Sequence, residues 1–151
     1  MNIQTDPNAA RKAWLGLLAK SPAADVAQLW ADFDAAPDHT VLRMPEIGGV
    51  MVRGRAGAVG APFNLGEMSV TRASVKLACG AVGHGYVQGR SKDHGLQTAL
   101  IDALMQTDRA EELDAKILKP LRDAYAARRD GRAAKAAATK VDFFTMVRGE
   151  D

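Results

Sequence analysis

The middle of the chain, residues 40–88, constrains the fold more than any other segment. It is rich in β-branched residues, is interrupted by glycines, and lacks the period of about 3.6 residues that marks a helix. The candidate strands are 40–44, 50–56, 63–77 and 82–88. Their connections are too short for a parallel crossover, which needs roughly a dozen residues. The sequence therefore predicts a four-stranded antiparallel meander.

The glycines in this stretch predict turns. We expect tight connections at 47–49 and at Cys79-Gly80. The glycines between 57 and 66 have the wrong spacing for a phosphate-binding loop, and no Lys-Ser or Lys-Thr pair follows them, so a hairpin loop is the better interpretation. The alternation of side chains changes along 63–77, which predicts a β-bulge near Thr71 and Arg72.

Alternation also predicts two unlike faces for the sheet. In the second candidate strand, Val50 and Val52 point to one side, whereas Arg53 and Arg55 point to the other. One face of an antiparallel sheet is commonly covered by the core, and the other meets solvent. We therefore expect an apolar face under helices and a cationic face that is a candidate binding surface.

Helical signals precede the sheet. Asp6-Pro7 and Ser21-Pro22 are typical helix starts, and the second helix is expected to run to about residue 36. Trp14 and Trp30 fall on the apolar faces of these two helices, where core packing is the simplest role for them. The N-terminus is therefore predicted to be a helical hairpin.

The helical period returns after the last candidate strand. Three leucines spaced by four residues, beginning at Leu96, predict a helix that covers the sheet. A further helix is expected around 113–121, interrupted or restarted at Pro120. Residues 124–138 then form an alanine-rich polar helix that Gly131 weakens.

Length and composition fit a single domain. The chain has 151 residues, of which 47% are hydrophobic and 25% charged, as in ordinary globular proteins with one core. We expect an α+β fold in which helices flank the antiparallel sheet. Its segments are a helical hairpin at 1–37, the sheet at 38–90, helices at 91–140 and an apolar C-terminal tail at 141–151, which forms an extended arm.

Charge and cysteine usage argue against several classes of protein. A net charge of +2 is too small to indicate nucleic acid, and the basic residues near the C-terminus alternate with alanine instead of aromatic residues. No run approaches the roughly 20 apolar residues of a membrane span. The start of the chain does not resemble a secretion signal, and Cys79 alone allows no internal disulfide, so the cytoplasm is the expected compartment.

The sequence contains no strong catalytic signature, so we expect no catalytic residue and no metal site in this chain. His39, His84 and His94 are scattered and lack acidic or cysteine companions at ligand spacing. Cys79 has no evident base nearby and is better explained as a small residue in a turn than as a nucleophile. No cofactor is expected to bind this chain alone.

The segment 86–94 is the candidate anion-binding site. It lies at a predicted strand-to-helix turn, where free backbone N–H groups and the helix dipole favour an anion, and Arg90, Lys92 and His94 add donors. Phosphate or phosphonate fits such a site. The structural alternative is that Ser91 merely caps the helix while the cations are solvated, and sequence chemistry alone favours this alternative.

The C-terminal tail is the candidate partner-binding segment. Chain ends with little to bury are normally polar, yet Phe143, Phe144 and Met146 lie within the last nine residues beside Arg148. Exposure of these apolar side chains costs solubility unless they pack against another polypeptide or the chain's own core. The tail therefore indicates a subunit more than a free-standing catalyst.

Several blocks of the chain closely resemble the PhnG family. PhnG is a subunit of the bacterial carbon-phosphorus lyase core complex. The blocks are FNLGEMSVTRA at 63–73, GYVQGRSKDH at 85–94, ALIDALMQ at 99–106 and VDFFTMVRG at 141–149. They stand in the family's order and, with the helix around Trp14, span nearly the whole chain. The helix at 124–138 is the least distinctive part.

The resemblance implies a role in phosphonate catabolism. In that pathway PhnG, with PhnH, PhnI and PhnL, supports a reaction in which a phosphonate displaces adenine from ATP to form a ribose 1-phosphonate 5-triphosphate. PhnI is the subunit thought to carry the chemistry, PhnJ later cleaves the carbon–phosphorus bond, and PhnK is a further associated protein. ATP is thus expected to be a substrate of the complex.

Three hypotheses follow for the chain itself. In the first it is an accessory, scaffolding subunit whose tail clasps the larger partner. In the second it completes a phosphate or phosphonate site at a subunit boundary, with Arg72, Arg90 or Lys92 supplying charge in trans. In the third, which sets the resemblance aside, it is a small-anion-binding regulatory protein.

Overall fold

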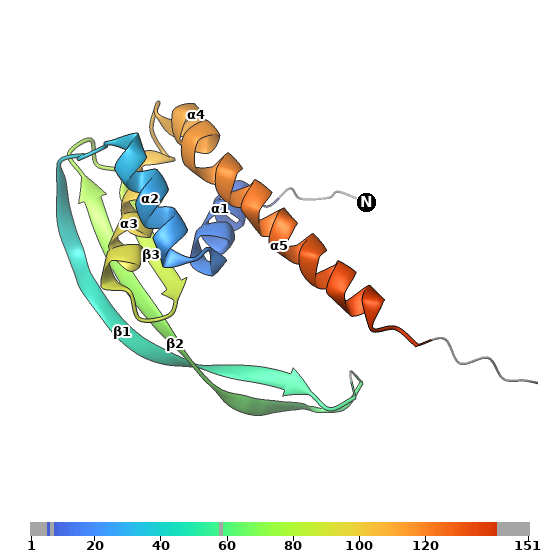
Figure 1. Cartoon of the computed structure of the whole chain (residues 1–151). Coiled ribbons are helices and arrows are strands. Elements are labelled where there is room, and N and C mark those ends of the chain that lie inside the picture. The colour runs from blue at the N-terminus through green and yellow to red at the C-terminus, as the bar shows by residue number, and fades with distance from the viewer. Residues whose placement is uncertain (1–5, 7, 58, 142–151) are drawn as a thin grey trace, which may run out of the picture.

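The computed structural model describes residues 6, 8–57 and 59–141 (Figure 1). In chain order the elements are the helices α1 (Ala9–Lys20) and α2 (Ala23–Phe33), the strands β1 (His39–Arg55), β2 (Pro62–Leu77) and β3 (Val82–Gln88), the helices α3 (Lys92–Leu104) and α4 (Ala110–Leu113), the π-helix η1 (Asp114–Leu118) and the helix α5 (Lys119–Ala138). The predicted α+β class, with an antiparallel sheet and flanking helices, is confirmed.

The sheet has three strands in the order β1-β2-β3, so the prediction of four strands was wrong. The two candidates at 40–44 and 50–56 are parts of the single long strand β1. Residues 46–52 continue in extended pairing with β2, and neither Gly48 nor Gly49 has a positive φ. These glycines therefore do not turn the chain, whereas Gly57 and Gly80, both with positive φ, lie in the two hairpin turns.

A register shift lies beside Arg72, as the alternation predicted, but the extra residue is in β1 opposite the segment from Arg72 to Ser74 and not in β2 itself. The β2–β3 pairing runs without a shift from Val70 to Lys76, past Thr71 and Arg72. The shifts lie in the β1–β2 pairing, two of them in β1, between Val41 and Glu46. Pro45 lies in this interval and has no N–H for the ladder, which is why a bulge on an edge strand accommodates it.

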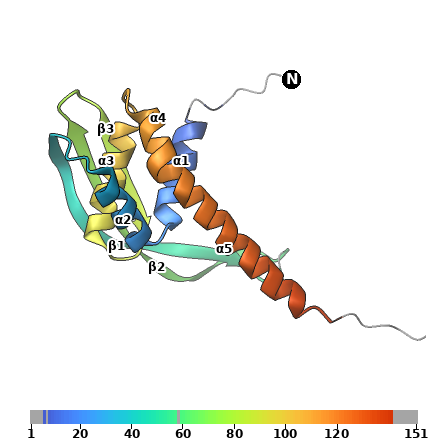
Figure 2. The ribbon, with the colours of Figure 1, turned by 45° about the horizontal axis from the view of Figure 1, so that its top comes forward.

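Strands β1 and β2 extend far beyond β3. Strand β3 pairs only with the part of β2 from Val70 to Lys76, so residues 49–69 form a two-stranded ribbon that continues alone. In Figures 1 and 2 this ribbon curves under the helices and projects from the same side of the body as the distal half of α5. None of the described residues of this ribbon is buried.

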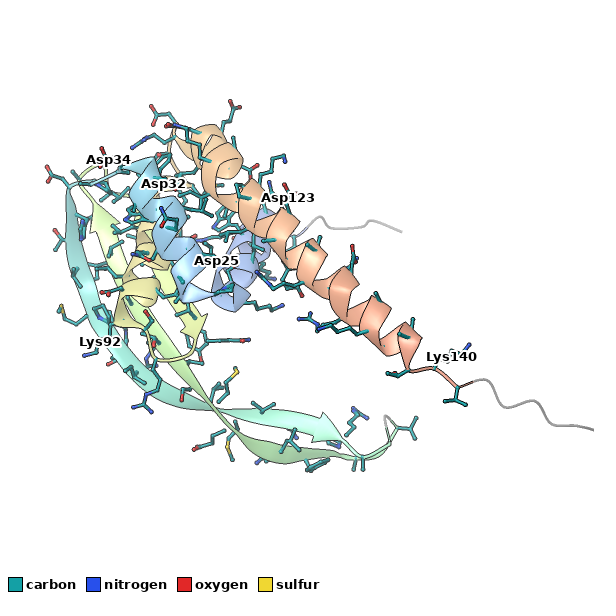
Figure 3. The ribbon with its side chains drawn as sticks, viewed as in Figure 1. Asp25, Asp32, Asp34, Lys92, Asp123 and Lys140 are labelled. Carbon is teal, nitrogen blue, oxygen red and sulfur yellow. The ribbon has the colours of Figure 1, made fainter. Side chains whose placement is uncertain are left out.

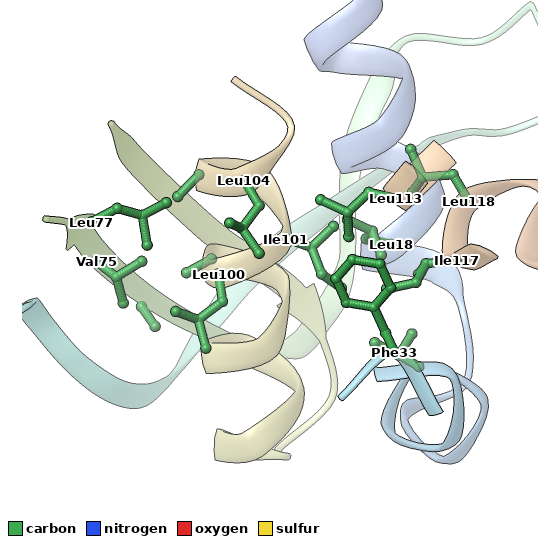
Figure 4. Packing of buried hydrophobic residues seen from close by; sticks show 14 of the residues in the cluster. Leu18, Phe33, Val75, Leu77, Leu100, Ile101, Leu104, Leu113, Ile117 and Leu118 are labelled. Carbon is green, nitrogen blue, oxygen red and sulfur yellow. The ribbon is translucent and has the colours of Figure 1, made fainter. Parts of the chain in front are cut away.

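Helix α3 lies directly on the inner face of the sheet. Its residues 98–104 are all buried, because the sheet covers one side and the other helices cover the opposite side. In Figure 4, Leu100 and Leu104 face Val75 and Leu77 of β2, whereas Ile101 points toward the second helical layer.

The contact between α3 and β3 is a close approach of two backbones. A Cβ atom added at Gly83 would lie 1.9 Å from the carbonyl oxygen of Ala99, and one added at Gly85 would lie 2.0 Å from that of Gly95. Small residues on both elements thus allow the helix to sit against the strand. The predicted covering helix is confirmed, and the glycines of β3 explain how closely it packs.

The second helical layer closes the core from the other side. Figure 4 shows Leu18 of α1 and Phe33 of α2 grouped with Leu113, Ile117 and Leu118. The predicted N-terminal helical hairpin is confirmed. Helix α2 nevertheless ends at Phe33, three residues earlier than predicted, because Asp34 adopts a left-handed conformation that stops it.

Helical backbone continues without a gap from α4 through η1 into α5, which begins at Lys119 with Pro120 in its first turn. The predicted interruption is therefore the π-helical segment just before Pro120, and the chain does not start a new helix there. The helix continues through Gly131 without a break. Arg128 donates to Asp25 of α2 over 3.3 Å, and every residue from 129 to 138 is exposed. Figure 3 shows Lys140 at the far end of this arm, and the tail that follows lies outside the described residues.

A candidate anion-binding groove on the open face of the sheet

The two faces of the sheet differ as alternation predicts. Thr71, Ala73 and Val75 of β2 are buried toward α3, whereas Arg72 and Ser74 between them point to the opposite face. Along β3, Gly83, Gly85 and Val87 are buried and His84 and Tyr86 are exposed. The helices described lie on the inner side, so the outer face is open.

A groove of about 350 Å³ lies on this open face. It is lined by Arg43, Arg72, Ala73, Ser74, His84, Gly85 and Tyr86. Register brings these residues together from all three strands. Arg43 pairs with Ser74, which pairs with His84, and in the neighbouring row Arg72 pairs with Tyr86. Residues that are far apart in the sequence thus form one polar surface.

Glu46 holds both arginines of the groove. Its Oε1 atom accepts from Nη1 of Arg43 over 2.5 Å and from Nε of Arg72 over 2.6 Å. The hydrogen bond from Arg43, followed by that from Arg72, lowers the pKa of the Glu46 carboxyl. All three side chains are about half exposed, so solvent screens these ion pairs and an incoming anion competes with them easily.

A serine and a histidine form the other side of the groove. Oγ of Ser74 lies 2.9 Å from Nδ1 of the His84 ring. No carboxylate among the described residues hydrogen-bonds to that ring, so the pair lacks the third group that orients the histidine in a nucleophilic triad. The pair therefore supplies polar hydrogen-bonding groups to the groove rather than an activated nucleophile.

A buried carboxylate supports the groove from the inner side of β3. Asp102 of α3 accepts from the backbone N–H of His84 over 2.9 Å and from Nε1 of Trp14 over 2.9 Å. Nη2 of Arg11 lies 2.6 Å from its Oδ2, and Nε of Arg11 lies 3.1 Å from its Oδ1. Trp14 is half-buried against the core, as predicted, but its bond to Asp102 gives no signal in the sequence.

The four residues predicted to bind an anion do not form one cluster. Arg72 lies in the groove, whereas Arg90 and Lys92 are exposed beyond the end of β3, where Figure 3 shows Lys92 beside the first turn of α3. His94 is only 2% exposed, and its Nε2 lies 3.0 Å from the carbonyl oxygen of Leu18. Its ring therefore faces the interior and does not join the two cations.

The structural alternative for the start of α3 agrees with the geometry. The side chain of Ser91 accepts from the backbone N–H of His94 over 3.2 Å, which is an N-cap. Burial lowers the pKa of the His94 ring, opposed by its bond to Leu18, so this histidine is a neutral core residue.

Sequence reasoning missed three polar members of the groove, Arg43, Ser74 and His84, and it included Tyr86 in the segment 86–94 without giving that residue a role. The alternation of β3 contained a signal for His84 and Tyr86, because both fall on the face opposite the three residues that pack on α3. Arg43 gave no such signal, since the bulges in β1 decide which residue of that strand lies beside Ser74.

A larger groove of about 650 Å³ lies among α1, α4, η1 and α5. Its lining is mostly apolar, and it includes Trp14, Leu17 and Met105. Both cations of its lining have carboxylate partners already, since Arg122 binds Asp114 through two bonds of 2.7 and 2.9 Å and Lys119 binds Asp123 over 2.9 Å. Size alone therefore does not mark this groove as a site for a charged ligand.

Other chemical features remain modest in the part of the chain that the structure describes. No group of three or more His, Cys, Asp or Glu side chains there is placed to hold a metal ion. Cys79 is exposed in the β2–β3 turn. None of the helices described has the length and apolar character needed to cross a bilayer.

The predicted partner-binding residues Phe143, Phe144, Met146 and Arg148 lie outside the described residues.

Comparison with known proteins identifies the family. A family model described as "Phosphonate metabolism protein PhnG" matches residues 9–149. A protein of Rhizobium meliloti (strain 1021), named alpha-D-ribose 1-methylphosphonate 5-triphosphate synthase subunit PhnG, is 43% identical over 147 residues, which cover 95% of this chain and 92% of that protein. The match covers the helices, the ribbon and the groove alike, and the chain belongs to the PhnG family.

Proposed function

We propose that this chain is an accessory subunit of an alpha-D-ribose 1-methylphosphonate 5-triphosphate synthase and acts there through contacts with other subunits. The name of its relative from Rhizobium meliloti and the coverage of nearly the whole chain support this role. In the reaction that the family resemblance implies, a phosphonate displaces adenine from ATP. ATP is then a substrate of the assembled complex, not a cofactor of this chain.

The observation that carries this proposal is the exposed ribbon at 49–69. Four large apolar side chains on it meet solvent: Met51 (53% exposed), Val59 (91%), Phe63 (46%) and Leu65 (67%). A two-stranded ribbon that no further strand or helix covers is only marginally stable in water. Apolar side chains gathered on such an element are typical of a surface that a partner covers.

The chemistry of the ribbon indicates the kind of partner. Both outer edges of the ribbon carry backbone N–H and C=O groups that the sheet described here does not pair, so a strand of another polypeptide can add to either edge. Arg53 and Arg55 add positive charge beside the apolar side chains. The partner we propose therefore has an apolar surface with acidic groups at its rim.

We assign this partner to the PhnI subunit, because the family resemblance implies that PhnI carries the chemistry. PhnH and PhnJ belong to the same proposed assembly, and PhnL and PhnK are associated proteins. The tail residues Phe143, Phe144, Met146 and Arg148 form a second proposed contact with the same partner. We also propose that the chain acts in the cytoplasm, together with these partners.

Co-expression with the other subunits of the phosphonate operon tests this function. The wild-type chain is expected to elute with them in size-exclusion chromatography, and mass spectrometry identifies the partners. A ribbon variant that combines Met51→Glu with Leu65→Glu should lose them, because burial of two carboxylates against an apolar surface is costly.

A matched variant with two new carboxylates in the β2–β3 turn, Ala78→Glu with Cys79→Glu, should assemble as the wild type does. Both of those positions are exposed at the opposite end of the sheet. If the ribbon variant assembles fully, the ribbon is not the docking element. If the wild-type chain elutes without any of the other subunits, the proposed function itself is wrong.

A further inference from the structure

We infer that the groove on the open face of the sheet binds a tetrahedral phosphorus oxyanion, either a phosphonate or the phosphate chain of a nucleotide. The identity of the anion rests on the proposed function, whereas the binding chemistry follows from the side chains of the groove. This site is separate from the start of α3, to which the sequence pointed.

The donors of the groove converge because antiparallel pairing places them opposite one another. Side chains directly opposite on one face of an antiparallel pair have Cβ atoms about 5 Å apart. Arg43, Ser74 and His84 form one such row, and Arg72 and Tyr86 form the next. Two guanidinium groups, an imidazole and two hydroxyls therefore surround a hollow of about 350 Å³, which accommodates a phosphate group.

The arrangement of the arginines leaves donors directed to a ligand. Arg72 uses only Nε, and Arg43 only Nη1, to contact Glu46. The remaining N–H groups of both guanidiniums can donate to an anion in the forked geometry that arginine gives to phosphate oxygens. Glu46 thus holds two planar groups in place but also cancels one of their charges, so the pair keeps one net positive charge.

The histidine adds a further donor. In the tautomer in which the hydroxyl of Ser74 donates to Nδ1 of His84, the ring carries its own proton on Nε2. That N–H is available to the groove, as is the hydroxyl of Tyr86, which is exposed beside Arg72. The bond from the His84 backbone to Asp102 fixes this part of β3, so the donors are held in position before a ligand arrives.

Glu46 provides the sharpest test of the site. A carboxylate that competes with the ligand for the same two arginines should weaken anion binding, so Glu46→Gln should strengthen it. If Glu46 serves only to hold the two arginines in place, Glu46→Gln should instead weaken anion binding, because the substitution loosens both arginines. The direction of this change therefore separates a binding site from a surface ion-pair network.

The experiment is isothermal titration calorimetry of the full chain, and of the co-purified complex, with tripolyphosphate, ATP and methylphosphonate as separate ligands. Arg43→Ala with Arg72→Ala should weaken binding about tenfold or more, the loss expected when charge-assisted hydrogen bonds are removed. Glu46→Gln should tighten it by about threefold or more at low salt, where charges are least screened. The ligand that binds most tightly distinguishes a nucleotide from a phosphonate.

The matched control is Arg129→Ala with Arg132→Ala, which removes the same charge from exposed positions of α5 outside the groove. Binding by this variant should match the wild type. The inference is overturned if both double variants lose affinity equally, if Glu46→Gln weakens binding, or if no ligand binds either the chain or the complex. If the double arginine variant fails to fold, Arg72→Lys replaces it, and unchanged affinity there would overturn the inference too.

These outcomes differ from those that test the proposed function. A complex that assembles normally but does not respond to the groove variants contradicts this inference and leaves the proposed function intact. A chain that binds tripolyphosphate through Arg43 and Arg72 but co-purifies with no other subunit supports the groove and contradicts the proposed function.

Discussion

At the scale of single residues, Asp102 connects the interior of the protein to the open face. It is fully buried, and it accepts from Arg11 of α1, from Trp14 of α1 and from the backbone of β3 at His84. A buried carboxylate is tolerated only when such partners satisfy it. Asp102 therefore joins three elements at one point, and its partners explain how a carboxylate is tolerated in the buried part of α3.

Asp102→Asn should destabilise the chain by about 3 kcal/mol, because the amide places N–H groups against the donors of Arg11 and Trp14 and removes the buried carboxylate that pairs with the partly buried guanidinium of Arg11. The free energy of unfolding, measured with urea, checks this value. Asp32→Asn is the control, since Asp32 is exposed and accepts only from Gln28. Its effect should stay within about 0.5 kcal/mol, and an equal loss in the two variants would contradict the role given to Asp102.

His94 gives the protein an acid-sensitive core position. Burial lowers its pKa in the folded state below the ordinary value of 6.5, so the unfolded chain takes up this proton first as the pH falls. The stability that depends on neutral His94 is therefore complete above about pH 6.5 and is lost as the pH falls toward the lower pKa of the folded state.

Unfolding free energies measured between pH 7.5 and about pH 5 should fall for the wild type. His94→Gln, which is neutral and keeps a donor for the carbonyl of Leu18, should flatten the profile in this range. His39→Gln is the control, because His39 is exposed, and it should keep the slope of the wild type. A slope that persists in His94→Gln would assign the acid sensitivity to other groups.

At the scale of elements, the close contact of α3 with β3 decides how the sheet is covered. Gly83 and Gly85 of the strand face backbone carbonyl groups of the helix at distances that no Cβ atom tolerates. A flexible side chain could move aside, but the backbone of a buried helix cannot do so cheaply. The glycines are thus required by packing, since neither of them has a positive φ.

Gly85→Ala should therefore destabilise the protein by about 3 kcal/mol or more, at the upper end of the overpacking range. Gly66→Ala is the matched control in β2, because nothing lies within 4 Å of the position where its Cβ would stand. That variant should be neutral or slightly stabilising. Thermal unfolding followed by circular dichroism measures both, and a neutral Gly85→Ala would show that α3 shifts easily on the sheet.

At the scale of the whole molecule, the body and its projections have different roles. The body contains one core between the sheet and two layers of helices. The ribbon at 49–69 and the distal part of α5 extend from it with little to bury, and both carry arginines. Projections of this kind contribute little to the stability of an isolated chain, which agrees with a protein that functions in an assembly.

Deletion of residues 141–151 tests the contribution of the tail to that assembly. Burial of Phe143, Phe144 and Met146 against a partner is worth on the order of 5 kcal/mol before the cost of ordering them is subtracted. The truncated chain should therefore lose its partners in size-exclusion chromatography and keep its helix and sheet content by circular dichroism. Retention of the full complex would show that the tail is dispensable for assembly.

Much of the fold was predictable from the sequence. The helical hairpin before the sheet, the antiparallel pairing of β2 with β3, the helix that covers the sheet and the interruption of the helix before Pro120 are all encoded locally, by side-chain period, by turn glycines and by proline. Four blocks of sequence were also enough to indicate the PhnG family, which the comparisons confirm.

Only the tertiary structure decided which segments form one continuous strand and which residues lie side by side. The segment at 47–49 continues as a strand because β2 pairs with it along its length, although its glycines favour a turn. His94 faces the core because α1 packs over its ring. The groove exists because register places Arg43 beside Ser74 and His84. The spacing of apolar side chains and the turn preferences of glycine and proline reflect interactions between neighbours in the chain. The register of strand pairing and the burial of a side chain depend on segments that are far away in the sequence. No local pattern specifies those segments.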